Sequence, residues 1–217
     1  MKLFDVYPLF DIKPVKAHGS YIWDKHGTKY LDFYGGHAVI SIGHSHPHYV
    51  RKISEQLNSV GFYSNSVKNT LQEQLAMKLG KLSGYNDYTL FLCNSGAEAN
   101  ENALKLASFQ NGRRKIIAFN KSFHGRTSLA VGATDDKSIL SPVNENPNII
   151  FLPLNNEEKL EAAMNDEVCA VIIEGIQGVG GVNIPAKTFL QKIKMLCEKF
   201  GAIMILDEVQ SGYGRSG

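Results

Sequence analysis

From residue 89 onward, continuous apolar runs alternate with amphipathic segments, and this alternation limits the fold more than any other feature. The apolar runs lie at 89–93, 115–119, 149–153, 168–175 and 202–208. Runs of this length fit strands that are buried on both faces, which is the pattern of parallel sheets covered by helices. Between the last two runs, apolar residues at helical spacing predict a helix that Gly201 ends. The expected fold class is therefore α/β, with a mainly parallel sheet and flanking helices.

The part of the chain before residue 89 predicts a hairpin and two helices. Residues 18–34 alternate around a glycine-containing turn at 24–28, which is typical of a β-hairpin. Pro47 begins a helical stretch with apolar residues at 50, 53, 57 and 60, and leucines at 71, 75, 79 and 82 predict a second helix. We expect an N-terminal segment over 1–48 and a large domain over 49–217.

Charge and cysteine content argue against several classes of function. Lys plus Arg is 23 and Asp plus Glu is 21, so a net charge of +2 gives no reason to expect nucleic acid or an anionic membrane as partner. No apolar run could span a bilayer, and Asp5 and Asp11 interrupt the stretch that a signal peptide needs, so a cytoplasmic protein is expected. Cys93, Cys169 and Cys197 lie far apart in apolar runs, which indicates reduced core thiols.

Two residue clusters follow the first two apolar runs. In Asn94–Glu98, Ser95 and Glu98 have the spacing of a capping box, and Gly96 lets the backbone approach a ligand at a helix N-terminus. A capped helix without a ligand fits this cluster equally well. In 123–127, Phe123 can cover a flat ligand and Arg126 can grip a carboxylate, although this cluster taken alone favours a surface loop with an isolated arginine.

Two more clusters end the last two runs. Residues 174–181 hold four glycines after Glu174, a carboxylate that is costly at a strand end unless it has a partner. Asp207 follows an apolar strand directly, so it is expected at the buried edge of the sheet. It needs a cation or several donors there, and a protonated heterocyclic nitrogen or the N–H groups of the next loop would both serve. Ligands of parallel sheets bind at this edge.

Taken together and in this order, the motifs resemble those of the class III pyridoxal-phosphate aminotransferases, nearest to the acetylornithine type. The resemblance extends from Tyr7 through GSYIWDKHGTKYLDF, GHSHP, NSGAEANENALKLA, FHGRT and EGIQGVGG to LDEVQSGYGRSG. It implies the type I fold of pyridoxal-phosphate-dependent transferases, a homodimer, and pyridoxal 5'-phosphate as cofactor bound by the domain over 49–217.

The resemblance also implies which residues hold the cofactor. Gly96 and Ala97 would bind its phosphate through backbone N–H groups, with Ser95 adjacent, and Asp207 would pair with the ring nitrogen. The ring and its phenolic oxygen would be contacted by Phe123, Val209 and Gln210. For the substrate, Arg126 would hold the α-carboxylate of an ornithine-type amino donor. Tyr7 and His37 are further candidates for substrate binding. Since His37 could donate to an acyl oxygen or to a second carboxylate, acetyl and succinyl substrates both stay open.

The sequence departs from the family pattern in two respects. The Schiff-base lysine of the family is expected beyond Gly217, so no catalytic residue is assigned within the chain, and Lys121 is expected to be a solvated loop lysine. The small C-terminal domain and the arginine for 2-oxoglutarate are expected beyond Gly217 as well, so the fold would be truncated. Gly175 and Val179 also replace the proline and second glutamate of the commoner pattern, which puts the usual switch between substrates in doubt.

Two hypotheses follow from the resemblance. The chain belongs to a longer enzyme that transfers the distal amine of N-acetylornithine or N-succinylornithine to 2-oxoglutarate in arginine biosynthesis, or it is a non-catalytic remnant that lacks the Schiff-base lysine. A metal site at His44, His46 and His48 is not expected, because Pro47 interrupts the alternation.

Overall fold

A three-stranded antiparallel sheet begins the part of the chain that the computed structural model describes, residues 1–216. Its strands are β1 (Pro14–His18), β2 (Tyr21–Asp24) and β3 (Lys29–Leu31), in the order β1-β2-β3. The predicted hairpin is confirmed as β2 and β3, and β1 is a strand that the sequence pattern did not predict. Asp24 holds the turn, since its Oδ1 accepts from the backbone N–H groups of His26 at 2.8 Å and Thr28 at 2.9 Å.

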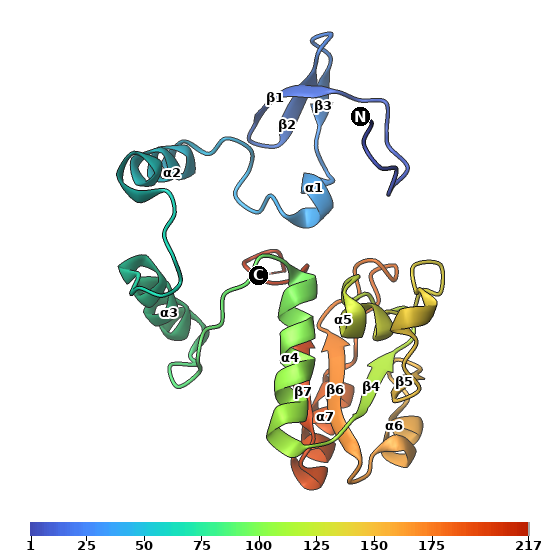
Figure 1. The fold of residues 1–217 in the computed structure, drawn as a ribbon. Coiled ribbons are helices and arrows are strands. Elements are labelled where there is room, and N and C mark those ends of the chain that lie inside the picture. The colour runs from blue at the N-terminus through green and yellow to red at the C-terminus, as the bar shows by residue number, and fades with distance from the viewer. Residues whose placement is uncertain (217) are drawn as a thin grey trace. The chain divides into compact units, whose positions relative to one another are not determined.

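Three helices follow this sheet along the chain (Figure 1). The first, α1 (Gly35–Ala38), is a short turn, and the other two are α2 (Pro47–Val60) and α3 (Thr70–Ser83). Both longer helices are confirmed where the sequence predicts them. Pro47 occupies the first turn of α2, and α3 ends at Gly84 in the left-handed conformation. Neither helix buries a residue, although each carries an apolar stripe.

The chain divides into two compact units, the first unit at Met1–Tyr88 and the second unit from Thr89 on. The division into domains 1–48 and 49–217 stays a prediction. In the second unit, four parallel strands form a sheet in the order β5-β4-β6-β7. These strands are β4 (Lys115–Phe119), β5 (Ile149–Leu152), β6 (Val168–Glu174) and β7 (Ile203–Asp207). The predicted α/β class with a parallel sheet is confirmed.

The strand predicted at 89–93 is wrong, because the structure assigns no strand to these residues. An apolar run becomes a strand only where a neighbouring strand pairs with it, and this run has no such neighbour among residues 1–216. Phe91 and Leu92 are exposed as a result. The prediction that Cys93 is a core thiol is wrong for the same reason, because Cys93 ends this unpaired run and is exposed. Cys169 and Cys197 are buried, as predicted.

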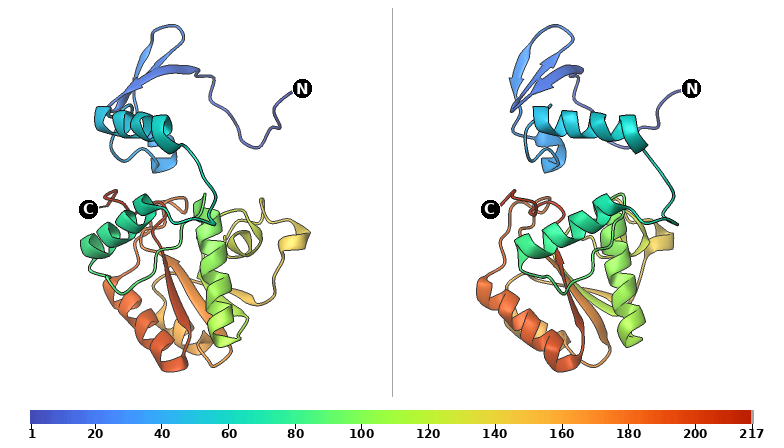
Figure 2. Two further views of the ribbon diagram at one scale, coloured as in Figure 1. Left: turned by 60° about the vertical axis from the view of Figure 1, so that its left-hand side comes forward. Right: turned by 90° about the vertical axis from the view of Figure 1, so that its left-hand side faces the viewer.

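Helices cover both faces of this sheet, as the two views of Figure 2 show for α4 and α7. On one face lie α4 (Gly96–Asn111) and α5 (Ser128–Gly132), and on the other α6 (Glu157–Ala163) and α7 (Lys187–Phe200). A short 3₁₀ turn, η1, spans Pro142–Asn144. The predicted helix stop is confirmed, because Gly201 adopts a left-handed conformation at φ 66°.

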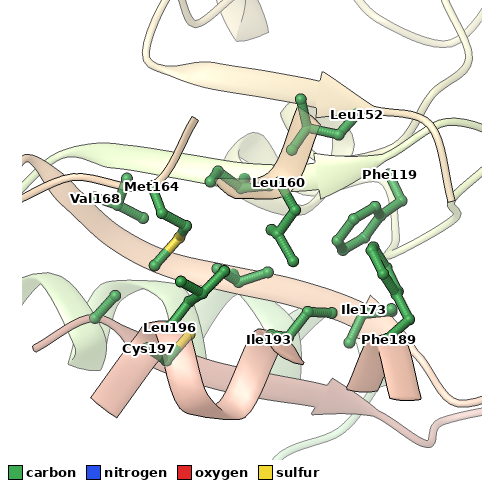
Figure 3. Close-up of a cluster of buried hydrophobic side chains, with 13 residues drawn as sticks. Phe119, Leu152, Leu160, Met164, Val168, Ile173, Phe189, Ile193, Leu196 and Cys197 are labelled. Atoms are coloured by element: carbon green, nitrogen blue, oxygen red, sulfur yellow. The ribbon is translucent and has the colours of Figure 1, made fainter. Parts of the chain in front are cut away.

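Alternate residues of each central strand enter different cores, which explains why the runs are apolar throughout. Along β4, Ile117 and Phe119 join the core with α6 and α7, and Ile116 and Ala118 join the core with α4. Figure 3 shows the first of these cores, where Phe119 and Phe189 meet edge to face with ring centroids 5.5 Å apart. Both cores support the carboxyl ends of the strands, where the polar clusters lie.

Candidate active site

Two buried carboxylates end the neighbouring strands β6 and β7. Glu174 and Asp207 are partners in the parallel register and are each only 6% exposed. Burial, with an added contribution from the nearby Asp207 carboxylate, raises the pKa of the Glu174 carboxyl. A Glu174 oxygen accepts from the backbone N–H of Phe123 at 2.9 Å. The strand end therefore fixes the backbone of the loop that carries Phe123 and Arg126.

Asp207 faces three N–H donors, the partners that a buried carboxylate requires. Its Oδ2 accepts from Asn100 Nδ2 at 2.7 Å and lies 2.7 Å from His124 Nδ1. Its Oδ1 accepts from the backbone N–H of Val209 at 2.9 Å. The expected position of Asp207 at the buried edge of the sheet is confirmed, and donors from α4, from the loop after β4 and from the next loop all reach it.

The N-terminus of α4 lies in the same unit and is capped by side chains. Ser95 is the N-cap, and its hydroxyl accepts from the Glu98 N–H at 3.2 Å. In return, the Glu98 carboxylate accepts from the Ser95 hydroxyl at 3.1 Å and from the Asn94 N–H at 2.8 Å. The predicted capping box is thus present, with the carboxylate bound one residue earlier than usual. Hydrogen bonds with Asn94 and Ser95 lower the pKa of Glu98.

The clusters at 94–98 and 123–127 and the one that begins at Asp207 meet where the backbone of a glycine comes close to its neighbour. A side-chain carbon on Gly96 would overlap the Val209 side chain, which joins the α4 N-terminus to the loop after β7. A side-chain carbon on Gly125 would come 2.6 Å from Ala97 Cβ. The loop after β4 therefore lies against the first turn of α4, and neither approach leaves room for a larger residue.

The third cluster meets its neighbours in the same way. A side-chain carbon on Gly178 would overlap the Gln210 side chain, and one on Gly180 would overlap the Lys121 backbone carbonyl. The glycine-rich loop after β6 thus packs on the loops after β4 and β7. The four clusters converge at the carboxyl edge of the sheet, as their positions at strand ends predict.

The remaining predicted residues lie on more open surface. Arg126 is exposed in the loop before α5, and Val209 and Lys121 are exposed too. In the first unit, Tyr7 is exposed, and the His37 ring lies within hydrogen-bond distance of the Tyr34 hydroxyl, with Nδ1 at 2.6 Å. The assignment of Tyr7 and His37 to a substrate site stays a prediction.

His44 pairs with Asp32 and not with the neighbouring histidines. His44 Nε2 and Asp32 Oδ2 are 2.7 Å apart, and this hydrogen bond lowers the pKa of Asp32. No group of three or more metal-ligating side chains occurs within residues 1–216. In the same range no helix is long and apolar enough to cross a membrane.

The sequence analysis assigned no role to Asn100 or His124, both of which contact Asp207. Asn100 lies in the second turn of α4, and His124 stands between Phe123 and Gly125. A signal was present for Asn100, since an amide among the inward positions of a helix needs a buried partner. That the partner is Asp207, 107 residues further on, depends on how α4 packs across the sheet.

Comparisons with known proteins agree with this architecture. The family description Aminotransferase class-III matches residues 5–217, and the chain belongs to this family. Acetylornithine aminotransferase of Bacillus anthracis is 42% identical over 219 residues, which cover 99% of this chain and 55% of that protein. The chain thus spans about half the length of that relative.

Solved structures show the same relationship. N-acetylornithine aminotransferase from Stenotrophomonas maltophilia is 34% identical with a TM-score of 0.79, over 96% of this chain and 53% of that one. Taurine:2-oxoglutarate aminotransferase from Bifidobacterium kashiwanohense is 28% identical with a TM-score of 0.88, over 99% of this chain and 54% of that one. Its crystal structure contains pyridoxal phosphate and glutamate. The fold is that of the pyridoxal-phosphate-dependent aminotransferases, as predicted, and the cofactor of this class is pyridoxal phosphate.

The residues of this edge fit such a cofactor at both of its charged ends. Asp207 Oδ1 accepts from the Val209 N–H and keeps acceptor capacity for a cationic ring nitrogen. Helix α4 is 16 residues long, and its first turn supplies N–H groups of the kind that bind phosphate. Gly96 itself carries no side chain in this turn, and the Val209 side chain lies in the space that one would need.

Proposed function

We propose that the protein carrying this chain is a pyridoxal-phosphate-dependent aminotransferase of arginine biosynthesis that acts in the cytoplasm. Its amino donor would be an N-acylated ornithine, acetyl or succinyl, and its acceptor 2-oxoglutarate. Support comes from the class III family match and from relatives named acetylornithine aminotransferase. These relatives favour the acetyl substrate over free ornithine.

The observation that carries this proposal is the position of Asp207, buried at the edge where the four clusters meet. A carboxylate in this place would stabilise a protonated ring nitrogen. When bound, pyridoxal phosphate supplies an electron sink for charge that develops on the substrate carbon. The role of Asp207 would be to keep the ring nitrogen positively charged. Burial strengthens the attraction between the carboxylate and this nitrogen.

The other cofactor contacts follow from the same arrangement. Gly96 and Ala97 would hold the phosphate through their N–H groups, with Ser95 capping the helix beside them. Phe123 would cover the ring, with its backbone held by Glu174. Val209, beside Gly96, and Gln210, beside Gly178, would contact the ring and its phenolic oxygen.

For the substrate, Arg126 would hold the α-carboxylate through two parallel hydrogen bonds. Tyr7 and His37 would contact the acyl end. Val179 is exposed in the loop after β6 and offers no charge there, so we propose that the exchange between amino donor and 2-oxoglutarate does not use a glutamate at this position.

We also propose that the working form is a homodimer. Exposed apolar side chains follow one stripe of α2, at Val50, Ile53, Leu57 and Val60. Exposed apolar surface of this kind marks a face that another protein surface covers. Sedimentation of the full-length protein at micromolar concentration should give twice the monomer mass.

The test uses the full-length protein, reconstituted with pyridoxal phosphate. Borohydride reduction followed by peptide mapping should find the cofactor on a lysine outside residues 1–217, and amino transfer to 2-oxoglutarate should be fastest with an N-acylated ornithine. An adduct on Lys121, or no transfer from any ornithine-type donor, would contradict the proposal. A protein that binds the cofactor but transfers nothing would support the non-catalytic remnant.

Arg126→Ala should raise KM for the amino donor about tenfold or more, because it removes a charged hydrogen-bonding partner. Arg114→Ala is the matched control, since Arg114 is exposed directly before β4, at the opposite edge of the sheet. Equal KM values in both variants would refute the role of Arg126.

A further inference from the structure

Asn100 places both hydrogens of its amide in contacts that link three elements. From α4, its Nδ2 donates to the His124 backbone carbonyl at 2.9 Å and to Asp207 Oδ2 at 2.7 Å. The residue is only 5% exposed. Because the amide has two hydrogens and both are used, Asn100 determines the distance between the loop after β4 and the end of β7.

His124 contacts the same carboxylate oxygen through its ring. Its side chain is fully buried, and Nδ1 lies 2.7 Å from Asp207 Oδ2. Within residues 1–216, Nε2 has no hydrogen-bond partner. An ionised carboxylate only accepts, so we assign the proton to Nδ1. The ring therefore donates from Nδ1 to Asp207, whereas the backbone N–H of His124 donates to Thr134 Oγ1 at 2.9 Å.

The two donors leave the Asp207 carboxylate in one orientation. Oδ2 accepts from Asn100 and His124, whereas Oδ1 accepts from the Val209 N–H. Without the first two donors, the carboxylate could rotate about the bond to Cβ, or turn toward solvent. With them, the acceptor capacity that remains lies on Oδ1.

We propose that Asn100 and His124 are positioning residues, which hold Asp207 so that Oδ1 is presented to the ring nitrogen of the cofactor. This inference rests on the proposed function, because it requires that pyridoxal phosphate binds at this edge. Neither residue contacts the cofactor in this arrangement. Both act through the orientation of one carboxylate, and Ser122, although buried in the same loop, does not contact it.

A pair of substitutions at His124 separates positioning from packing. His124→Phe keeps a ring of similar volume and removes the donor. His124→Asn loses volume but can present an amide N–H near the place of Nδ1. In the full-length protein, His124→Phe should weaken binding of pyridoxal phosphate about tenfold, and His124→Asn should stay within about twofold of the wild type. A role in packing alone predicts the reverse order.

A second measurement reads the ring nitrogen itself. With cofactor labelled with ¹⁵N in the ring, the nitrogen chemical shift should move toward the value of neutral pyridine in His124→Phe and should stay unchanged in His124→Asn. Ser122→Ala is the control, since its hydroxyl donates to the Ala133 carbonyl at 2.8 Å and does not reach Asp207. If His124→Phe does not fold, Asn100→Leu, of similar volume, should show the same weakening and the same change in shift.

Each outcome decides something different. A wild-type protein that binds no pyridoxal phosphate would overturn both the proposed function and this inference. Wild-type binding, with affinity and nitrogen shift unchanged in His124→Phe, would overturn the inference alone. Equal losses in His124→Phe, His124→Asn and Ser122→Ala would overturn it as well, because they would show a general loss of packing.

Discussion

The two units of the chain are stabilised in different ways. Within residues 1–216, every buried apolar side chain belongs to the second unit, where two cores cover the two faces of the sheet. The buried side chain of the first unit is polar: Asp24, which closes the turn between β2 and β3. Long-range packing of apolar residues thus holds the second unit, whereas local hydrogen bonds hold the first.

This difference shows what an amphipathic pattern does and does not establish. The stripes of α2 and α7 look alike in sequence, yet α7 buries Phe189 and Ile193 whereas α2 buries nothing. A stripe indicates which face of a helix needs cover, and the cover itself comes from elsewhere in the fold or from another protein surface.

The largest expected effect is in the core of the second unit. Phe189→Ala removes a fully buried ring that packs on Phe119, so it should lower the free energy of unfolding by about 3–5 kcal/mol. Leu57→Ala on α2 is the control, because Leu57 is 66% exposed and should change this free energy by less than about 0.5 kcal/mol. Urea unfolding of the chain as a monomer measures both, and equal losses would erase the distinction between the units.

A smaller effect is expected where distant loops of the second unit touch. Gly180→Ala would push a side-chain carbon into the Lys121 backbone carbonyl, so it should destabilise the protein by about 1–3 kcal/mol. Gly175→Ala is a matched control in the same loop, since its nearest neighbour would be Ser211 Oγ at 3.8 Å. Thermal unfolding distinguishes the two variants, and a neutral Gly180→Ala would mean that these loops do not depend on close approach.

In the first unit, the loss of the hydrogen bonds around Asp32 should speed hydrogen exchange only at neighbouring residues. Asp32 accepts from the Tyr34 and Gly35 N–H groups at 2.9 and 2.8 Å, and its hydrogen bond with His44 lowers the pKa of the Asp32 carboxyl. This stabilisation is present above the usual carboxyl pKa of 3.8 and is lost as the pH falls through the lowered value. Asp32→Asn should therefore speed hydrogen exchange at Tyr34 and Gly35 about fivefold at pH 6.

At a pH below the lowered pKa of Asp32 the same comparison should show little difference, because the wild-type carboxyl is then protonated too. Amides of the second unit, such as those of β6, provide the control and should exchange at the wild-type rate. Faster exchange in β6 would contradict the separate stabilisation of the two units.

The smallest effect is expected at Glu174. Burial raises the pKa of this carboxyl, so the folded protein holds a proton that the unfolded chain releases near pH 4.5, and stability falls as the pH rises through the raised value. Glu174→Gln cannot ionise and can still accept from the Phe123 N–H. Its melting temperature in the cofactor-free form should exceed that of the wild type by about 2 °C at pH 8 and match it at pH 4.5.

Exposed Glu208→Gln, one residue beyond β7, is the control, and its melting temperature should stay close to that of the wild type. A gain in melting temperature of Glu174→Gln that is the same at pH 4.5 and pH 8, or that appears only at pH 4.5, would contradict the raised pKa of Glu174.

Much of the fold was predictable from local pattern. Four of the five apolar runs became parallel strands, and the helices with clear stripes formed where expected. The run at 89–93 did not become a strand, because a strand depends on a partner that composition does not reveal. In the site, Asp207 and the capping box of Ser95 were predictable because each has a local cause: the end of a buried strand and a spacing of three residues.

The sequence alone determined that this chain forms a helix-covered parallel sheet with its polar clusters at the strand ends, because alternation and spacing are local properties of a chain. Only the tertiary structure decided that Asn100 and His124 meet on one oxygen of Asp207, and that Gly96 and Gly178 lie under Val209 and Gln210. These contacts join residues far apart in the chain, and their geometry depends on how layers of side chains fit together across the sheet.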